Sequence, residues 1–569
     1  MGATAVPAAP QVDVVWNRAL QAPPNTNTAR IAVRPLARGG CYAVYGSLDP
    51  LGPPNRMTVN RVDSEGVTLW TQTFDVVGGG FDNAPRGLNV GPDDELVVLV
   101  SGATSSYRCI KLLRDGTLAF DRVIPLGAGE ERIRVFDDPE VTPSGRILIA
   151  EFIEVTGAPQ VRVVRSLDAS GVDEWQFGLD GSFFYPYLAP AVDERAVVAV
   201  SRVDEVSVYA IDASGTLVWQ TDKALASGAS VGTVSTIDQN AAGEVAVLYS
   251  DSQPRQTTVL FLESDGQERY TRALGRYDFP DVPRMRLTSD GSVAYSKVDV
   301  PAIPGIPRPL VALGWMDPAG VTTWSIPYQE PNTRFDIVAL DANDGPIVSI
   351  AVSTTTGDSP RITPYLIGFD RGGQPTWSFF PDFVMPTSIA TRAAFGLGRP
   401  GQGYMLALDG TPSTGPLELV RFGLPEGQLG SASCGPLFPN STSQFGALDA
   451  VGDARALVND LTLVASRLPA GETTLFIGSR VLATTPTVPG IGSGLICLGG
   501  SIGRFDRPGE IRTTDAFGRT ALRVDLAQLP VGTGQSAAMA GETWSFQAWH
   551  RDSAAATATL TEALSITLQ

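Results

Sequence analysis

Histidine and cysteine, which often hold metals or take part in catalysis at neutral pH, are scarce in this chain. The 569 residues include one histidine, His550, and four cysteines. A Ser-His-Asp triad would have to use His550, because histidine is the general base of such a triad. No Cys-x-x-Cys motif exists, and one histidine cannot complete a mixed zinc site. The sequence therefore favours a structural role for His550, as a partly exposed residue on a strand.

One acidic cluster resembles a metal site. The segment Asp341-Ala-Asn343-Asp344-Gly is similar to the start of a calcium-binding loop, whose Asp and Asn side chains bind the ion through oxygen. The glutamate that closes such a loop is missing at its usual spacing. Asp341, Asn343 and Asp344 are thus a weak candidate for calcium, and a plain Asp/Gly turn is the alternative.

Arginine recurs in or beside short apolar segments that have the pattern of innermost β-strands. These arginines are Arg30, Arg86, Arg284, Arg286 and Arg392. If the segments surround one channel, the guanidinium groups form an anion-binding ring at its mouth. The alternative is that they form ion pairs with acidic residues of the same segments. Those acidic residues are Asp137, Asp138, Asp238 and Asp336.

These segments belong to a repeat that spans the first 430 residues. An apolar run leads into a turn, most often Asp-x-x-Gly, and an aromatic residue stands four positions after the glycine. The aromatic residues are Trp70, Phe120, Trp175, Trp219, Tyr270, Trp324 and Trp377. Their spacing of about 50 residues predicts stacked blades rather than independent domains. Asp and Gly suit a tight turn, and the aromatic side chain is expected to fill the gap between neighbouring sheets.

A second hairpin lies between successive copies of this motif, and eight such hairpins occur. Two hairpins per period give four strands, as in one blade of a β-propeller. The last blade needs both ends of the chain: residues 417–423 supply its third strand, and the segment around Trp16 supplies its outer strand. We therefore predict an all-β, eight-bladed β-propeller over residues 11–427, after a tail at 1–10. Seven blades are the alternative.

The Asp-x-x-Gly-x-x-x-Trp hairpin, clearest in VYAIDASGTLVWQTD around Trp219, resembles the tryptophan-docking repeat of quinoprotein dehydrogenases and of the outer-membrane assembly lipoprotein BamB. The resemblance covers about residues 11–427 and implies that the aromatic residues, Trp16 included, join neighbouring blades. For the dehydrogenases it also implies a quinone cofactor with Ca²⁺, a catalytic Asp and usually a vicinal disulfide. No adjacent cysteines occur here, so quinone-dependent oxidation is an alternative rather than the main prediction.

From about Ser431 the composition of the chain changes. The landmarks are Cys434 with Pro436, Asn440-Ser-Thr, Cys497 in LICLGG, and the GETWSFQAW run that leads to Asp552. They resemble a C-terminal module of secreted proteins from environmental bacteria, over residues 431–569. The resemblance implies a β-sandwich and a disulfide between Cys434 and Cys497, which suits an oxidising compartment. Cys41 and Cys109 lie on predicted strands of the first two blades and are either bridged or free and buried.

Charge and hydropathy limit the functions that remain. The net charge of −18 argues against nucleic acid as a partner. No run of 18 apolar residues predicts a transmembrane segment. The start MGATAVPAAP lacks the basic and apolar regions of a complete signal peptide. We expect a secreted or cell-surface protein whose signal peptide is not part of this sequence.

The main functional prediction is an extracellular, non-catalytic binding or scaffold protein that presents a rigid propeller to a protein, glycan or surface partner. Two alternatives stay open. One is a propeller enzyme, either quinone-dependent or a hydrolase or lyase that uses carboxylates and arginine. The other is a component of the cell surface that assembles with itself. No cofactor is predicted, apart from the possible calcium ion.

Overall fold

The computed structural model describes two β-rich regions that meet near residue 424. The residues it describes are 14–20, 27–36, 39–48, 55–76, 85–101, 106–125, 130–135, 138–155, 157, 160–179, 186–202, 204–225, 232–251, 256–276, 284–299, 310–328, 333–340, 344–354, 361–379, 385–386, 393–397, 402–408, 417–423, 429–433, 439–442, 445–452, 454–459, 461–486, 495–514, 518–532, 534–555 and 557–569. Within these ranges the only helical element is the short 3₁₀ helix η3 (Ala456–Val458), and no helix suited to crossing a membrane is found.

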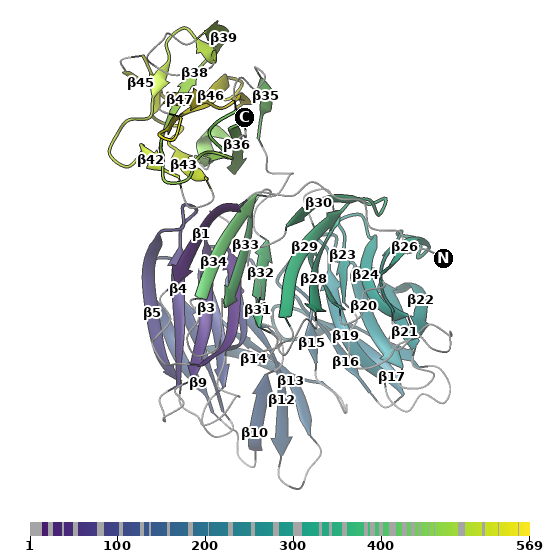
Figure 1. Cartoon of the computed structure of the whole chain (residues 1–569). Coiled ribbons are helices and arrows are strands. Elements are labelled where there is room, and N and C mark those ends of the chain that lie inside the picture. The colour runs from purple at the N-terminus through teal and green to yellow at the C-terminus, as the bar shows by residue number, and fades with distance from the viewer. Residues whose placement is uncertain are drawn as a thin grey trace.

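Seven sheets follow one another along the chain, each running from an innermost to an outermost antiparallel strand (Figure 1). Blade 1 contains β2 (Asn27–Pro35), β3 (Cys41–Leu48), β4 (Asn55–Val62) and β5 (Thr68–Val76). Blade 2 contains β6 (Pro85–Val90), β7 (Leu96–Ser101), β8 (Tyr107–Leu112) and β9 (Leu118–Ile124). Blade 3 contains β10 (Glu130–Val135), β11 (Glu140–Val141), β12 (Ile147–Val155), β13 (Val161–Leu167) and β14 (Asp173–Leu179). Blade 4 contains β15 (Tyr187–Leu188), β16 (Ala196–Ser201), β17 (Glu205–Ile211) and β18 (Leu217–Ala224).

The next three blades repeat this order. Blade 5 contains β19 (Gly232–Gln239), β20 (Val245–Asp251), β21 (Gln256–Leu262) and β22 (Glu268–Arg276). Blade 6 contains β23 (Met285–Leu287), β24 (Val293–Asp299), β25 (Leu310–Met316) and β26 (Thr322–Tyr328). Blade 7 contains β27 (Thr333–Leu340), β28 (Pro346–Thr354), β29 (Arg361–Phe369), β30 (Pro375–Phe379) and β31 (Met385–Pro386).

An eighth sheet joins the two ends of the propeller. Its strands are β32 (Ala393–Leu397), β33 (Gln402–Leu408), β34 (Leu417–Gly423) and β1 (Val14–Leu20). β1 pairs antiparallel with β34, and Trp16 lies opposite Arg421. Across the seam to blade 1, the Gly40 amide donates to the Tyr404 hydroxyl (3.1 Å) and Arg421 Nη1 donates to the Ser64 carbonyl. The predicted all-β propeller is confirmed, with eight sheets among the described strands.

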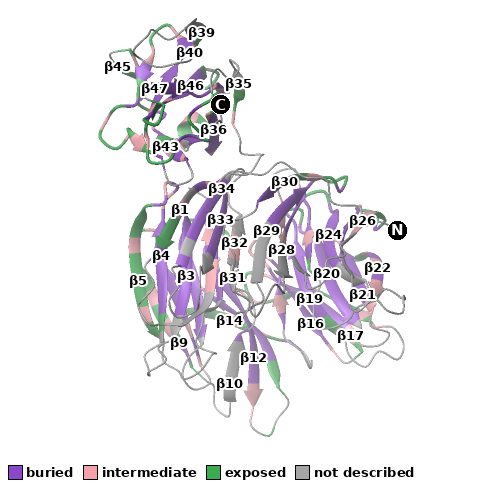
Figure 2. Ribbon diagram, viewed as in Figure 1, coloured by how far each residue is buried: buried purple, intermediate pink, exposed green. Residues whose placement is uncertain are grey.

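In blades 1 to 6 the described residues of the two middle strands are mostly buried, whereas the outermost strands are largely exposed or half-buried (Figure 2). In blade 4, every residue of β16 is buried, but β18 alternates between exposed and half-buried residues. A strand covered on both faces by neighbouring sheets can be apolar along its whole length. This explains why runs such as Ala196–Ser201 are continuous rather than alternating.

Each repeated aromatic ring, up to Trp324, packs on the glycine of the next blade's turn. Gly215 has φ +83°, and a methyl group added there would lie 2.7 Å from the Trp175 ring. Four indole groups also donate to a carbonyl two residues before the corresponding glycine. These bonds are Trp70–Arg114 (3.0 Å), Trp175–Ala213 (3.0 Å), Trp219–Ser264 (3.2 Å) and Trp324–Arg371 (2.7 Å). Trp377 differs because it is buried against Gly368 of its own blade, and the Trp16 side chain lies outside the described part.

The C-terminal region has two main sheets. The larger contains β35 (Ser431–Ser433), β38 (Thr473–Ser479), β41 (Gly503–Arg504), β42 (Arg512–Thr513), β46 (Thr543–Asp552), β47 (Thr557–Leu560) and β48 (Ala563–Thr567). The smaller contains β36 (Ala447–Gly452), β37 (Leu461–Ser466) and β43 (Thr520–Val524). Two hairpins are β39 (Val481–Pro486) with β40 (Leu495–Gly499), and β44 (Leu529–Val531) with β45 (Gly534–Ser536). Both main sheets contribute to one core, which includes Leu463, Phe476 and Trp544.

The smaller C-terminal sheet also packs against the propeller. Leu463 points into the core of its own region, whereas Val451 and Val464 join a cluster with Val15 and Leu20 of β1. Arg512 forms an ion pair with Glu65, in the turn after β4, at 3.2 Å. The C-terminal region therefore packs against the propeller next to β1, β34 and blade 1 (Figure 1).

Three predictions about single residues can be compared with this fold. Cys41 and Cys109 are both free and buried, so the alternative of a bridge between them is wrong. Burial raises the pKa of the Cys109 thiol to about 12. The prediction of a partly exposed His550 is also wrong: its ring is fully buried between β38 and β47. Cys434 lies outside the described residues, so its bridge to the buried Cys497 stays a prediction.

Candidate functional site

The innermost strands of the propeller surround a central pocket of about 610 Å³. All eight blades contribute to its wall, because the pocket lies where their first strands converge. The lining residues include Arg34, Asn89, Glu140, Ala191, Thr236, Arg286, Ile337 and Phe395, in blade order. A volume of this size suits a small ligand or one group of a larger partner.

Two of the five predicted arginines line this pocket. Arg284 and Arg286 come from β23 and the residue just before it. Arg284 is exposed and Arg286 is half-buried. The side chains of Arg30 and Arg86 and the whole of Arg392 lie outside the described part, as do those of Asp137 and Asp336. The sequence did not single out Arg34, which also lines the pocket.

The carboxylates of the pocket wall are engaged by protein donors. Arg34 Nη2 donates to Asp138 Oδ2 at 2.5 Å, and the Leu88 amide donates to the other oxygen at 3.0 Å. Glu140 Oε2 accepts from Asn89 Nδ2 (3.1 Å) and from the Ala191 amide (3.3 Å). Each acid therefore links its own blade to a neighbouring one, and Asp138 pairs with Arg34 rather than with one of the five predicted arginines.

Arg286 has a different environment. Asp238, which interacts electrostatically with it, is buried and accepts from the amides of Leu287 (2.8 Å) and Gln239 (3.0 Å). Burial raises the pKa of Asp238, while the charge of Arg286 opposes this shift. Among the described residues, Arg286 has no hydrogen-bond or ion-pair partner. A half-buried guanidinium with free donors faces the pocket.

The calcium prediction is only partly covered by the structure. Asp344 adopts φ +61°, and its Oδ2 accepts from Ser289 Oγ (2.6 Å) and Arg371 Nη2 (2.6 Å). Asp341 and Asn343 lie outside the described residues, so calcium stays a prediction. Within the described ranges, no three His, Cys, Asp or Glu side chains form a cluster suited to a metal.

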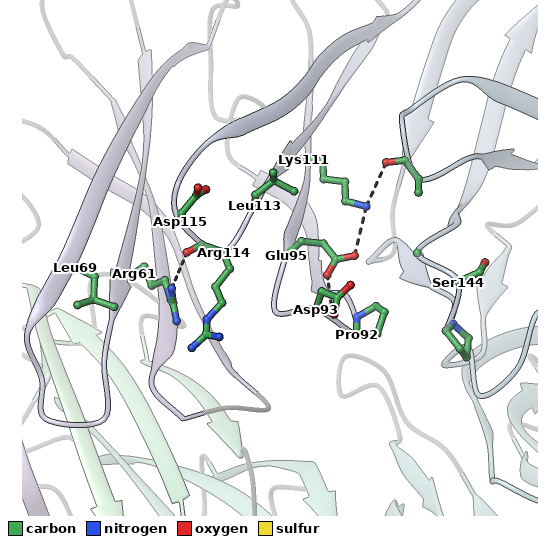
Figure 3. Close-up of a pocket in the computed structure, with 13 residues that line it drawn as sticks. Arg61, Leu69, Pro92, Asp93, Glu95, Lys111, Leu113, Arg114, Asp115 and Ser144 are labelled. Atoms are coloured by element: carbon green, nitrogen blue, oxygen red, sulfur yellow. Dashed lines mark hydrogen bonds and ion pairs between the residues drawn. The ribbon is translucent and has the colours of Figure 1, made fainter. Parts of the chain in front are cut away.

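A second pocket of about 670 Å³ lies between the turns of blades 1, 2 and 3 (Figure 3). Its charged residues are Arg61, Asp93, Glu95, Lys111, Arg114 and Asp115. Lys111 Nζ and Glu95 Oε1 are 3.3 Å apart, and each side chain is only 6% exposed. The sequence analysis did not predict this site. Arg61 and Lys111 nevertheless share a sequence signal, because each stands directly before the apolar residue that ends the third strand of its blade.

His550 lies apart from both pockets. Its Nε2 is 2.6 Å from Thr559 Oγ1, and Nδ1 is buried without a partner in the described part of the chain. Burial lowers the pKa of the ring to about 4, although Asp552 and Glu472 act in the opposite direction. This enclosed ring is consistent with the predicted structural role, which stays a prediction.

Known proteins give little further guidance. No protein-family model matches the chain, and no curated protein is similar to it in sequence. The WD40 domain of SCAP from fission yeast has 10% identity and a TM-score of 0.42, over 72% of this chain and 98% of that one. Sqt1 from Chaetomium thermophilum has 12% sequence identity and a TM-score of 0.41, over 72% of this chain and 98% of Sqt1. Prolyl oligopeptidase B from Galerina marginata has 9% sequence identity and a TM-score of 0.35. The match covers 61% of this chain and 47% of the peptidase.

The eight radial sheets and the pocket at their centre define this chain as a β-propeller with a C-terminal β domain. The solved structures that it resembles at this low level include both WD40 domains and the propeller-containing prolyl peptidases. Fold likeness leaves ligand and activity open.

Proposed function

We propose that this protein is a non-catalytic, extracytoplasmic binding protein whose central pocket takes an anionic group of its ligand. The observation that carries the proposal is Arg286, a half-buried guanidinium that faces a pocket of about 610 Å³ without an ion-pair partner in the described part of the chain. Guanidinium groups bind carboxylate, sulfate and phosphate through parallel hydrogen bonds. Arg284, on the same pocket wall, adds positive charge.

The surroundings of the pocket support binding rather than catalysis. Asp138 and Glu140, the acids of the described wall, accept bonds from neighbouring blades and hold the strands in place. A general acid or base needs a lone pair or proton directed at the substrate. Asp238 has a raised pKa, but both of its oxygens accept backbone amides. This favours rigid binding over the hydrolase or lyase alternative.

The first prediction concerns Arg286. Isothermal titration calorimetry of the full chain with citrate, inorganic phosphate and a sulfated disaccharide should show saturable binding of at least one anion. Arg286→Gln should weaken that binding at least about tenfold, because a charged hydrogen bond contributes about 1.5–3 kcal/mol. Affinity should fall as salt is raised, because ions screen the attraction between the guanidinium group and the anion.

The matched control is Arg551→Gln, which removes the same charge from an exposed residue of β46. It should bind the anion as tightly as the parent protein. Equal affinity of the Arg286→Gln and parent proteins, or no binding of any of the three anions, would contradict the central pocket as an anion site.

The second prediction concerns the location of the protein. If it works outside the cytoplasm, Cys434 and Cys497 form a disulfide, whereas Cys41 and Cys109 stay reduced because they are buried. Mass spectrometry of alkylated, non-reduced peptides should therefore give one linked pair, containing Cys434 and Cys497. Alkylation of all four cysteines in the unfolded, non-reduced protein would refute it.

A further inference from the structure

The pocket between blades 1, 2 and 3 has its own pattern of buried cations. In blades 8, 1 and 2, the residue opposite the docking aromatic on the third strand is basic: Arg421, Arg61 and Lys111. Each donates to a turn carbonyl of the next blade. The acceptors are Ser64, Arg114 (2.6 Å) and Ala169 (3.3 Å). The cation thus contributes to the joint between blades.

Arg61 differs from Lys111 in one respect. Lys111 has a buried counter-ion, Glu95, whereas no described carboxylate forms an ion pair with Arg61. Arg61 is only 7% exposed, and its Nε has no hydrogen-bond partner in the described residues. Burial of a charge without a counter-ion is costly in free energy. Burial is the main cause that lowers the pKa of Arg61. The charge of Arg114 adds to this shift, whereas Tyr42, Asp94 and Asp63 oppose it.

Arg114 brings a second guanidinium to the same place. Its side chain is 42% exposed, and its Nε forms a long ion pair with Asp94 Oδ2 at 3.9 Å. Figure 3 shows the guanidinium groups of Arg61 and Arg114 on the same side of the pocket, with the Asp115 carboxylate directed away from them. Glu95 lies beside Lys111 and is neutralised by it. Arg61 and Arg114 therefore bring two positive charges to one cavity, with Asp94 beside Arg114 and Asp93 on the same wall.

The wall of this pocket also has an apolar part, beside the polar residues Asp93 and Ser144. Leu69 and Leu113 line it and are 50% and 41% exposed, and Pro92 and Pro143 lie on the same wall. Exposed leucine beside a paired guanidinium site favours a ligand that has both an oxyanion and an apolar body.

We propose that this pocket is a second ligand site, in which Arg61 and Arg114 bind the oxyanion of an amphipathic organic anion and Leu69 and Leu113 contact its apolar part. The oxyanion is a carboxylate, a sulfate-type group or a phosphate. The site is separate from the central pocket, because the two share no lining residue.

Trp70 provides the readout for the test. Its indole donates to the Arg114 carbonyl, the same oxygen that accepts from Arg61. The probes are 4-methylbenzoate, toluene-4-sulfonate and phenyl phosphate, with benzyl alcohol as the uncharged comparison. All titrations use an Arg286→Gln background, so that failure of the central pocket as an anion site does not affect the result.

At least one of the three anions should change the tryptophan fluorescence in a saturable way and bind at least about tenfold more tightly than benzyl alcohol. The preferred probe identifies the headgroup. The signal should vanish in Trp70→Phe, which keeps an aromatic ring as blade 2 does with Phe120. Arg114→Gln and Arg61→Met should each weaken binding at least about tenfold, and Arg551→Gln should leave it unchanged.

Because Arg114 is exposed, Arg114→Gln is expected to fold even if Arg61→Met does not. Binding in Arg114→Gln that equals the parent's would overturn the proposal. So would affinities for all three anions no greater than that for benzyl alcohol.

Discussion

Gly215→Ala should destabilise the propeller by about 3 kcal/mol, although it adds a single methyl group. The residue has φ +83°, where an L side chain costs about 1–2 kcal/mol. The new Cβ would also lie 2.7 Å from the ring of Trp175 in the preceding blade. The ring has to move, and its packing and its bond to the Ala213 carbonyl are weakened. Urea unfolding followed by tryptophan fluorescence measures the loss.

Gly157→Ala is the matched control for this substitution. Gly157 lies in the same propeller with φ +69°, but no atom of the described residues lies within 4 Å of the position of its Cβ. Its substitution should cost only the unfavourable backbone conformation, about 1–2 kcal/mol. If the two variants lose the same stability, the contact between Trp175 and Gly215 does not hold the blades together.

Acidification should destabilise the C-terminal domain through His550. The pKa of the ring is about 4 in the folded chain, against an ordinary value of 6.5, because burial disfavours its charged form. The contribution of the neutral ring is thus complete above pH 6.5 and is lost as the pH falls toward 4. A difference of this size corresponds to about 3 kcal/mol. Asp552 and Glu472, the acids near the ring, already reduce the shift.

The comparison that isolates this effect is between the parent protein and His550→Gln. Gln is uncharged at all these pH values and can still bond to Thr559. Thermal unfolding at pH 7.5, 6, 5 and 4 should show a difference between the two proteins that shifts in favour of His550→Gln as the pH falls. Parallel pH profiles for both proteins would refute the burial of a neutral His550.

The repeat could be predicted from the sequence because its signals are local. A turn glycine, an aromatic residue four positions later and apolar runs on either side define two hairpins, whatever surrounds them. The lone strand around Trp16 indicated that the chain closes on itself, and β1 does pair with β34. Trp377 keeps the motif but not the contact, because it is buried within its own blade against Gly368.

The sites were harder to predict, because they depend on which side chains meet. Arg284 and Arg286 were expected at the channel mouth and lie there, since the innermost strand of any blade must face the axis. Arg34 and Asp138 are 104 residues apart in the sequence, and their pairing needs the relative position of blades 1 and 3. His550 illustrates the same limit, because strand alternation cannot show that β38 and β47 enclose the ring.

The sequence by itself thus determined the all-β class, the four-stranded repeat and the closing strand, because turns and hydrophobic periodicity act within one hairpin. Only the tertiary structure decided which charges are neutralised. Lys111 forms an ion pair with Glu95, whereas Arg61, at the equivalent position of the preceding blade, donates to the backbone carbonyl of Arg114 and has no ion pair among the described residues. The energy of a buried charge depends on neighbours brought by other strands and blades, and that is why the candidate sites emerged only from the fold.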